Sequence, residues 1–208
     1  MSQAAPRAKA GAGVQRRSEI TRARILQVSQ QLFSQNGYDA TGVAEICAAA
    51  AVSKGAFYHH FPSKQAVFMT LLEGWLAALD EQMLPLLEGA RSVAEGIQQA
   101  ASITGLVFAS ASGQLPMFLE FWRESSHDPL VWQATIAPYR RYQELFASLV
   151  RKGIEEGSLR PVDPNSAART IVALAFGLIL QGVIDPHGAD WGEVTQNGIR
   201  LFMEGLSK

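Results

Sequence analysis

Residues 41–64, TGVAEICAAAAVSKGAFYHHFPSK, constrain the fold of this 208-residue chain more than any other segment. Their first apolar residues recur at i, i+3, i+4 and i+7: Val43, Ile46, Cys47 and Ala50. This spacing places one apolar stripe along a short helix, whose first turn Thr41 can cap. The segment therefore begins with a helix of about two turns that packs on one side.

A second short helix follows after a tight turn, with Ser53 as its predicted cap. Phe57 and Phe61 share one face of it at i, i+4 and can pack inward. Pro62 and the residue after it end this helix and begin another. Polar and small residues occupy its other faces: Lys54, Ala56, Tyr58, His59 and His60. A short helix that presents donors outward is typical of a helix that enters the major groove of DNA.

The order of a threonine cap, a short helix, the run VSKGAFYHHFPSK and a following amphipathic helix resembles the TetR/AcrR family of bacterial helix-turn-helix transcription regulators. The resemblance is dense over residues 18–72 and weak beyond them. Ala51 occupies a turn position where the family usually has glycine. Alanine adopts a positive φ at a cost on the order of 1 kcal/mol, so we expect an atypical turn.

The resemblance implies a set of residues that contact a double-stranded DNA operator. The hydroxyl and amide of the first would approach a phosphate, the next four would meet base edges and phosphates, and the others would reach the sugar-phosphate backbone or bases: Thr41, Ser53, Lys54, Gly55, Ala56, Tyr58, His59, His60 and Lys64. Helix N-terminal amides and lysines attract phosphate without reading sequence. Ala56 can contact at most a thymine methyl group, so it reads sequence weakly.

Charge is distributed unevenly along the chain, although its formal net charge is -1. Residues 1–64 hold eight Lys or Arg and three acids, a net +5, whereas the remainder holds ten Lys or Arg and sixteen acids, a net -6. The basic end suits phosphate binding. Residues 1–17 contain no acid and lack the apolar stretch of a secretory signal, so we expect a disordered basic tail, with an accessory hold on DNA phosphates or a minor groove as a secondary role.

The apolar periodicity predicts an all-α fold. The resemblance implies three regions: a tail over 1–17, a helix-turn-helix domain over 18–64, and a helical effector-binding and dimerisation domain over 65–208. The first helix should cover 18–35, and the fourth should run from Ser63 until Pro85 interrupts it. Further helices are predicted over 92–111, 115–126, 130–156, 164–182 and 191–206. Pro138 should kink or break the third of these.

The predicted helix over 164–182 is apolar nearly all round and therefore needs neighbours on every side. It can form a four-helix contact with a second copy, together with Leu201, Phe202 and Leu206 of the last helix. Small residues would permit close approach: Ala173, Gly177 and Gly182. The resemblance implies a homodimer through 164–182 and 191–206, and the alternative is a core helix of a monomer. The longest apolar run has ten residues, too few for a bilayer, so we expect no membrane partner.

Aromatic and sulfur side chains are concentrated in the larger domain. The resemblance implies that they line an adaptable pocket for a lipophilic small-molecule effector: Trp75, Phe108, Met117, Phe118, Phe121, Trp122, Tyr139, Tyr142 and Phe176. The alternative for each is ordinary core. Four polar residues next to them should be mostly solvated: Glu120, Arg123, Glu124 and His127.

The sequence offers little for catalysis or metal binding. Its single cysteine, Cys47, excludes an intramolecular disulfide, and the adjacent His59 and His60 would point about 100° apart on a helix. No phosphate-binding glycine loop or nucleophile motif is present, so we expect no cofactor, no metal and no enzyme activity. The predicted function is that of a cytoplasmic repressor that an effector releases from a palindromic operator. The alternative is a helical adaptor module that does not read DNA.

Overall fold

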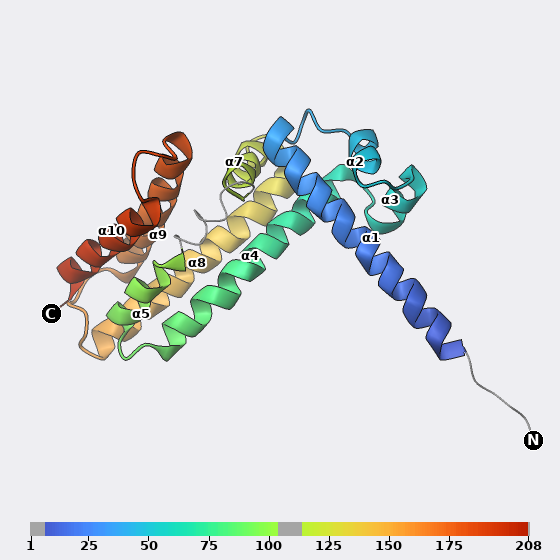
Figure 1. The fold of residues 1–208 in the computed structure, drawn as a ribbon. Coiled ribbons are helices and arrows are strands. Elements are labelled where there is room, and N and C mark those ends of the chain that lie inside the picture. The colour runs from blue at the N-terminus through green and yellow to red at the C-terminus, as the bar shows by residue number, and fades with distance from the viewer. Residues whose placement is uncertain (1–6, 104–113, 208) are drawn as a thin grey trace, which may run out of the picture. The chain divides into compact units, whose positions relative to one another are not determined.

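The computed structural model describes residues 7–103 and 114–207 (Figure 1). Its helices are α1 (Arg7–Asn36), α2 (Val43–Ala49), α3 (Lys54–His60), α4 (Lys64–Gly89), α5 (Val93–Ala100), α7 (Gln114–Ser125), α8 (Pro129–Glu155), α9 (Pro164–Ile184) and α10 (Trp191–Leu206). The described residues contain no strand, so the predicted all-α fold is confirmed. The chain divides into two compact units, Met1–Leu72 and Glu73–Lys208, and the boundary falls within α4.

The core of the N-terminal unit joins α1, α2, α3 and α4 through side chains that are fully buried: Ile25, Phe33, Ile46, Phe57, Val67 and Phe68. The rings of Phe33 and Phe68 meet edge to face with centroids 5.7 Å apart. Phe57 and Phe61 are both buried, as their i, i+4 spacing predicted. One aromatic residue from α3 is thus enough to fix that short helix to the unit.

Helix α1 begins at Arg7, eleven residues before the predicted start at residue 18. The prediction of a disordered tail is therefore wrong for residues 7–17, and residues 1–6 lie outside the described part of the chain. Alanine and arginine are strong helix formers, and no proline interrupts the segment after Pro6. Because residues 25–33 are already held helical by packing, adding turns to the N-terminal side requires no new nucleation.

The loop between α1 and α2 is closed by Thr41, which does not cap α2 as predicted. The N-cap residue is Gly42, and Thr41 is fully buried. The Thr41 hydroxyl donates to the carbonyl of Gly37 at 2.8 Å, and Gly37 has the positive φ of 84° that ends α1. The Thr41 hydroxyl therefore points into the unit, where it satisfies a loop carbonyl, and it does not cap α2.

The turn between α2 and α3 is a Schellman motif centred on Ala51. The N–H of Val52 donates to the carbonyl of Cys47 at 3.0 Å, and the N–H of Ala51 donates to Ala48 at 3.1 Å. Ala51 has φ of 50°, a left-handed conformation that favours glycine, so of the two expectations for this turn, strained or differently shaped, the structure has the strained one. Ser53 then caps α3, as predicted, by accepting from the N–H of Ala56 at 3.1 Å.

Two prolines do not interrupt their helices. Helix α4 is capped by Ser63, which accepts from the N–H of Ala66 at 3.0 Å, and it continues through Pro85 to Gly89. Helix α8 likewise runs through Pro138. The predicted interruption at Pro85 and the predicted break at Pro138 are wrong, while the predicted kink at Pro138 stays a prediction. Pro85 lies in the last two turns and removes a single backbone donor, while α7 and α9 pack against α8 and hold it helical around Pro138.

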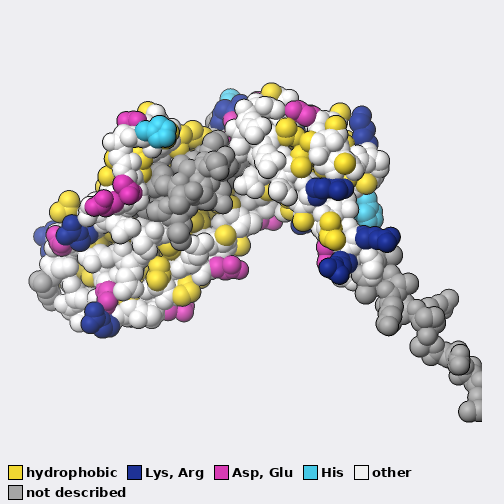
Figure 2. Space-filling view, in the orientation of Figure 1, with side chains coloured by type: hydrophobic (Ala, Val, Ile, Leu, Met, Phe, Trp, Pro, Cys, Tyr) yellow, Lys and Arg dark blue, Asp and Glu magenta, His cyan; other side chains and the backbone are white. Residues whose placement is uncertain are grey.

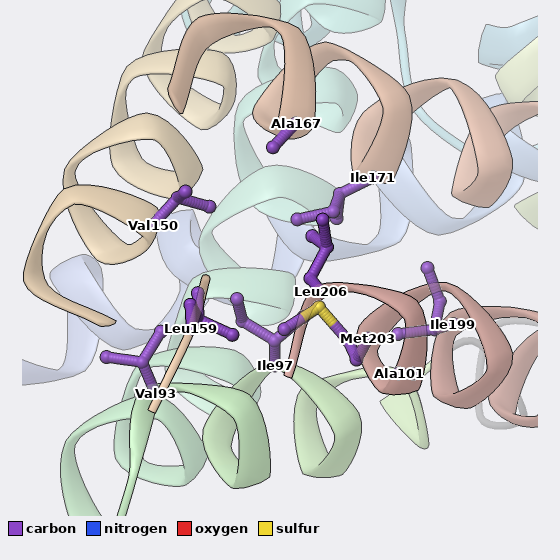
Figure 3. Close-up of a cluster of buried hydrophobic side chains, with 10 residues drawn as sticks. All are labelled: Val93, Ile97, Ala101, Val150, Leu159, Ala167, Ile171, Ile199, Met203 and Leu206. Carbon is purple, nitrogen blue, oxygen red and sulfur yellow. The ribbon is translucent and has the colours of Figure 1, made fainter. Parts of the chain in front are cut away.

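The core of the C-terminal unit lies where α5, α8, α9 and α10 meet (Figure 3). It is formed by Val93, Ile97, Ala101, Val150, Leu159, Ala167, Ile171, Ile199, Met203 and Leu206. Leu159 follows α8 and packs so closely on Gly153 that a Cβ there would lie 2.6 Å from its Cδ1 atom. The predicted helix over 191–206 matches α10 to the residue.

Helix α9 exposes apolar side chains on one face. By length and composition alone this helix of 21 residues, with a mean hydropathy of 1.9 over an 18-residue window, could cross a membrane, and core helices of soluble proteins share these properties. Leu180 and Ile184 are 45% and 74% exposed. Gly182 and Leu206, in contrast, are buried inside the unit, so their predicted place in a contact with a second copy is wrong.

The conformation of Ala51 predicts the effect of Ala51→Gly. Glycine adopts a positive φ without the Cβ clash, so the free energy of unfolding should rise by about 1 kcal/mol in urea denaturation. Ala49→Gly, in the helical part of α2, is the matched control and should lower it by about 1 kcal/mol. Destabilisation by both substitutions would contradict the strained turn.

Candidate functional site

The first candidate site is the outward face of α3. Lys54, Gly55, Tyr58 and His59 are exposed, and Tyr58 is 53% exposed although its ring packs edge to face on buried Phe57. These side chains follow one another around the helix because the single inward position is taken by the phenylalanine. The structure therefore brings together a lysine, a phenol and an imidazole on a surface that the unit's own core does not use.

Gly55 is the second residue of α3, and neither packing nor backbone conformation within the unit requires a glycine there. A Cβ built there meets nothing closer than the Oγ atom of Ser53 at 3.9 Å, and its φ is negative. Glycine in a helix costs roughly 0.5–1 kcal/mol relative to alanine. A glycine without a packing role on an exposed helix suits the close approach of a second molecule's backbone.

Two of the predicted contact residues serve the unit itself. The hydroxyl of Thr41 is buried, and its amide donates to the carbonyl of Tyr38 at 3.3 Å. Lys64 donates from Nζ to the same carbonyl at 2.7 Å, and its ammonium lies 4.1 Å from the centroid of the Tyr38 ring. Both residues fasten the loop before α2, so we leave them out of the candidate surface.

The two histidines of α3 differ in their surroundings. His59 is exposed, whereas His60 is half-buried, with the two ring centroids 5.1 Å apart. Burial, then the neighbouring His59 and Arg22, lower the pKa of His60 below its usual value. Arg22 reaches this end of α3 from α1, with its guanidinium 5.0 Å from the Phe61 ring centroid. Within the described residues, no group of three or more His, Cys, Asp or Glu lies close enough to hold a metal.

Basic side chains of α1 belong to the same unit as α3. Figure 2 shows Lys, Arg and His side chains gathered over these two helices, with few acidic groups among them. Arg16, Arg17 and Arg24 are exposed on α1. The sequence predicted that the first two lie in a disordered tail. The Ala- and Arg-rich composition, without a proline after Pro6, was the signal that could have placed them on a helix despite Gly11 and Gly13.

The second candidate site is a cluster of aromatic rings in the C-terminal unit. Trp122 of α7, Tyr139 of α8 and Phe176 of α9 form three ring pairs, with centroids 5.6–6.3 Å apart and planes at 85–88°. All three are half-buried. Trp75 of α4 packs with Trp122 and Phe176 against Ile179. Four helices thus contribute large apolar side chains to one place, which suits an apolar ligand.

Other predicted pocket residues have different positions. Phe108 lies outside the described residues, and the side chains of Met117, Phe118 and Phe121 do as well, although α7 carries them. Tyr142 faces Asp80 of α4, to which its hydroxyl donates at 2.8 Å. The prediction omitted several aliphatic members of the cluster, since aliphatic residues occur in every apolar face: Leu79, Leu119, Ile179 and Val183.

Helix α7 carries a compact charged group beside this cluster. Arg123 contacts a carboxylate oxygen of Glu120 at 3.0 Å and one of Glu124 at 2.9 Å. Glu124 is buried, contrary to the expectation that these residues would mostly be solvated. A buried carboxylate needs such a partner, and the spacing along α7 supplies it.

Asp80 links α4 to α8 through two side chains. Arg141 donates to one of its oxygens at 2.7 Å, and Tyr142 donates to the other. Burial and this hydrogen bond raise the pKa of Tyr142 well above its usual value. The pair of bonds joins α4 to α8 at the middle of both helices.

Two family models match the chain. Residues 25–70 match the model of bacterial regulatory proteins of the tetR family, and residues 98–197 match the C-terminal domain of BetI-type transcriptional repressors. The first match covers α2, α3 and most of the N-terminal core, and the second covers most of α7 to α10.

Named relatives and solved structures extend the likeness over most of the chain. The HTH-type transcriptional regulator UidR of Escherichia coli (strain K12) is 29% identical over 169 residues, which cover 80% of this chain and 83% of UidR. The crystal structure of reduced E. coli NemR superposes with a TM-score of 0.72 at 27% identity, covering 87% of this chain and 95% of that one. A putative transcriptional regulator from Saccharomonospora viridis, in complex with choline, superposes with a TM-score of 0.78 at 20% identity, covering 91% and 99%.

The contact between Tyr142 and Asp80 predicts the pH dependence of Tyr142→Phe. At pH 7 the variant should lose about 1 kcal/mol of unfolding free energy, the value of one hydrogen bond. The raised pKa keeps the phenol neutral in the folded chain while the unfolded chain ionises near pH 10, so wild-type stability falls as pH rises. The difference in free energy of unfolding between wild type and Tyr142→Phe should therefore be about 0.4 kcal/mol smaller at pH 10 than at pH 7. Urea denaturation at both pH values measures this, and Tyr139→Phe is the control, expected to leave stability within about 0.5 kcal/mol. A gap that widens with pH would contradict the assignment.

Proposed function

Because the chain belongs to the TetR family of bacterial regulatory proteins, we propose that it is a cytoplasmic, dimeric transcription repressor that a small-molecule effector releases from a palindromic operator. The helix-turn-helix of α2 and α3 would bind the operator, and the C-terminal unit would bind the effector and a second copy. The proposal divides the work between the two units.

The observation that carries the proposal is the exposed face of α3. Lys54 would attract phosphates, and Gly55 and Ala56 would allow the backbone to approach base edges. Tyr58 and His59 would reach the sugar-phosphate backbone, and His60 would stand at the edge of the interface. None of these side chains contributes to the buried core of the unit, so their free surface is available to DNA.

The adaptor alternative is not favoured. UidR is named an HTH-type transcriptional regulator, and NemR is named an HTH-type transcriptional repressor. An adaptor would have no need for an exposed lysine and two histidines on the helix that occupies the reading position. The family is one of transcription regulators, and we propose no enzyme activity for this chain.

The exposed face of α9 supports the proposed dimer. Ala173, Gly177, Leu180 and Ile184 follow one another at i, i+4, i+7 and i+11, and a Cβ built on Gly177 would meet nothing within 4 Å. Leu201 on α10 is 65% exposed. A second copy would cover these apolar side chains by a two-fold contact of α9 and α10. Such symmetry would place two α3 helices about 34–36 Å apart on a palindrome.

The aromatic cluster supports the proposed effector site. Trp75, Trp122, Tyr139 and Phe176 would surround a ligand with substantial apolar surface. Trp75 belongs to α4, whose N-terminal turns carry the core residues Val67 and Phe68 of the other unit. A ligand that favours a different position of α4 would thereby change the spacing between the α3 helices of the two copies. The size of this effect would be set by the difference between the ligand's affinities for the DNA-binding and the released conformations.

The role of Lys54 predicts that Lys54→Ala weakens operator binding roughly threefold to tenfold at 0.15 M salt and reduces the slope of log K against log salt by about 0.9. Electrophoretic mobility shift with DNA from beside the gene, titrated with salt, measures both. Lys152→Ala removes an exposed lysine from α8 and should change neither. Unchanged affinity and slope in Lys54→Ala would remove this residue from the interface.

The exposed stripe on α9 predicts that Leu180→Glu combined with Ile184→Glu dissociates the dimer. Two carboxylates cannot be buried in an apolar contact without partners, so sedimentation should report one chain of 22.5 kDa instead of two. The palindromic complex should disappear with it. Leu130→Glu, at an apolar position of α8 that is 63% exposed, is the control and should stay dimeric. A dimer that persists in the double variant would place the contact elsewhere.

A further inference from the structure

The N-terminal part of α1 carries most of the positive charge of its unit. Residues 7–24, here named the basic arm, contain six Lys or Arg and one acid: Arg7, Lys9, Arg16, Arg17, Arg22, Arg24 and Glu19. Only two further basic residues, Lys54 and Lys64, occur in residues 1–72, and the second of these is already bound to Tyr38. The strongest cationic feature of the unit thus lies outside the helix-turn-helix.

The described side chains of the basic arm lie outside the core of the unit. Among the described residues of α1, the first buried one is Ile25, and most side chains before it are exposed. In the part of the chain that the structure describes, Arg16, Arg17 and Arg24 form no ion pair with any acid. These guanidinium groups therefore stabilise neither the core nor a surface pair, and they remain fully available to a partner.

The helix gives these charges a common direction. At 100° per residue, Arg16, Arg17 and Arg24 fall within about 100° of one another on one side of α1. Arg22 lies elsewhere on the helix, where it packs on Phe61 at the end of α3. This contact ties the arm to the exposed helix, and from it the arm extends about 22 Å toward Arg7. Figure 1 shows this part of α1 projecting past α2 and α3.

We infer that the basic arm is a second DNA-binding element, which holds the phosphate backbone beside the groove that α3 enters. The inference rests on the proposed operator binding and adds a contact outside the helix-turn-helix. The ligand is the duplex phosphate backbone, because three exposed guanidinium groups on one side of a helix, none of them in an ion pair within the described residues, match a polyanion. The arm makes no base-specific contact in this arrangement, so it adds affinity for any sequence and leaves the choice of operator to α3.

Arg16→Gln combined with Arg17→Gln, in the full chain, tests the arm. Glutamine keeps the helix propensity and removes both charges. We expect the operator affinity at 0.15 M salt to fall by roughly threefold to sixfold for each phosphate that the variant no longer binds, and the salt slope to fall by about 0.9 for each such phosphate. Affinity for a duplex without the operator should fall by the same factor, since phosphate binding is blind to sequence.

Two matched variants separate charge from structure. Arg16→Lys combined with Arg17→Lys keeps both charges and should retain most of the salt slope. Arg160→Gln combined with Arg169→Gln removes two exposed charges from the C-terminal unit and should leave DNA binding unchanged. Far-ultraviolet circular dichroism should show equal helix content in all three variants, so a loss of binding cannot come from melting of the arm.

Hydroxyl-radical footprinting supplies an independent measurement. Wild type should protect backbone sugars beyond the two grooves contacted by α3, and the double glutamine variant should lose that protection alone. If wild type forms no salt-sensitive specific complex, the proposed function itself is overturned. If wild type binds and the glutamine variant has the same affinity, slope and footprint, the DNA-binding role of the arm is overturned while the proposed function stands, and an acidic protein surface becomes the partner to examine.

Discussion

The burial of Phe57 is the interaction on which the reading surface depends. A helix of seven residues, such as α3, is unstable by itself because its nucleation cost exceeds the gain from so few hydrogen bonds. The fully buried Phe57 ring anchors the helix in the core of the unit and supplies stability that so few backbone hydrogen bonds cannot. The cap from Ser53 and the turn at Ala51 then fix where the helix starts and how it leaves α2. Every exposed side chain of α3 takes its direction from that ring.

The sequence predicted the elements that local physics decides. The i, i+4 pair of Phe57 and Phe61 and the cap at Ser53 are properties of a few neighbouring residues, and the structure has both of them. The boundaries of α10 were predicted to the residue because Asp190 caps one end, accepting from the N–H of Glu193 at 3.0 Å. Where the chain itself contains the stop and start signals, spacing is sufficient.

The errors arose where a side chain is used by a distant part of the chain. Threonine is a common N-cap residue, yet the hydroxyl of Thr41 donates to the carbonyl of Gly37 and does not cap α2. The ammonium of Lys64 contacts the carbonyl and the ring of Tyr38, a use that its sequence position did not predict, and its phosphate contact stays a prediction. A single sequence cannot reveal these competitors, because both options satisfy the same donor and only the three-dimensional packing decides between them. The aliphatic members of the aromatic cluster were missed for a related reason, since nothing local distinguishes Ile179 from other core residues.

The exposed charges of the N-terminal unit would contribute more to affinity for DNA than to sequence specificity. Lys54 and the arginines of α1 attract any phosphate, and Ala56 offers a base edge only a methyl group, so few side chains of this surface discriminate by hydrogen bonding. In the proposed complex, the choice of sequence would then come from the position of α3, that is, from how closely Gly55 would let its backbone approach and from the spacing that a second copy would impose. The strained Ala51 at the α2–α3 turn would therefore matter beyond its energy, because it would set the angle at which this helix meets the groove. The turn, more than any single contact, is where specificity of this surface would be altered.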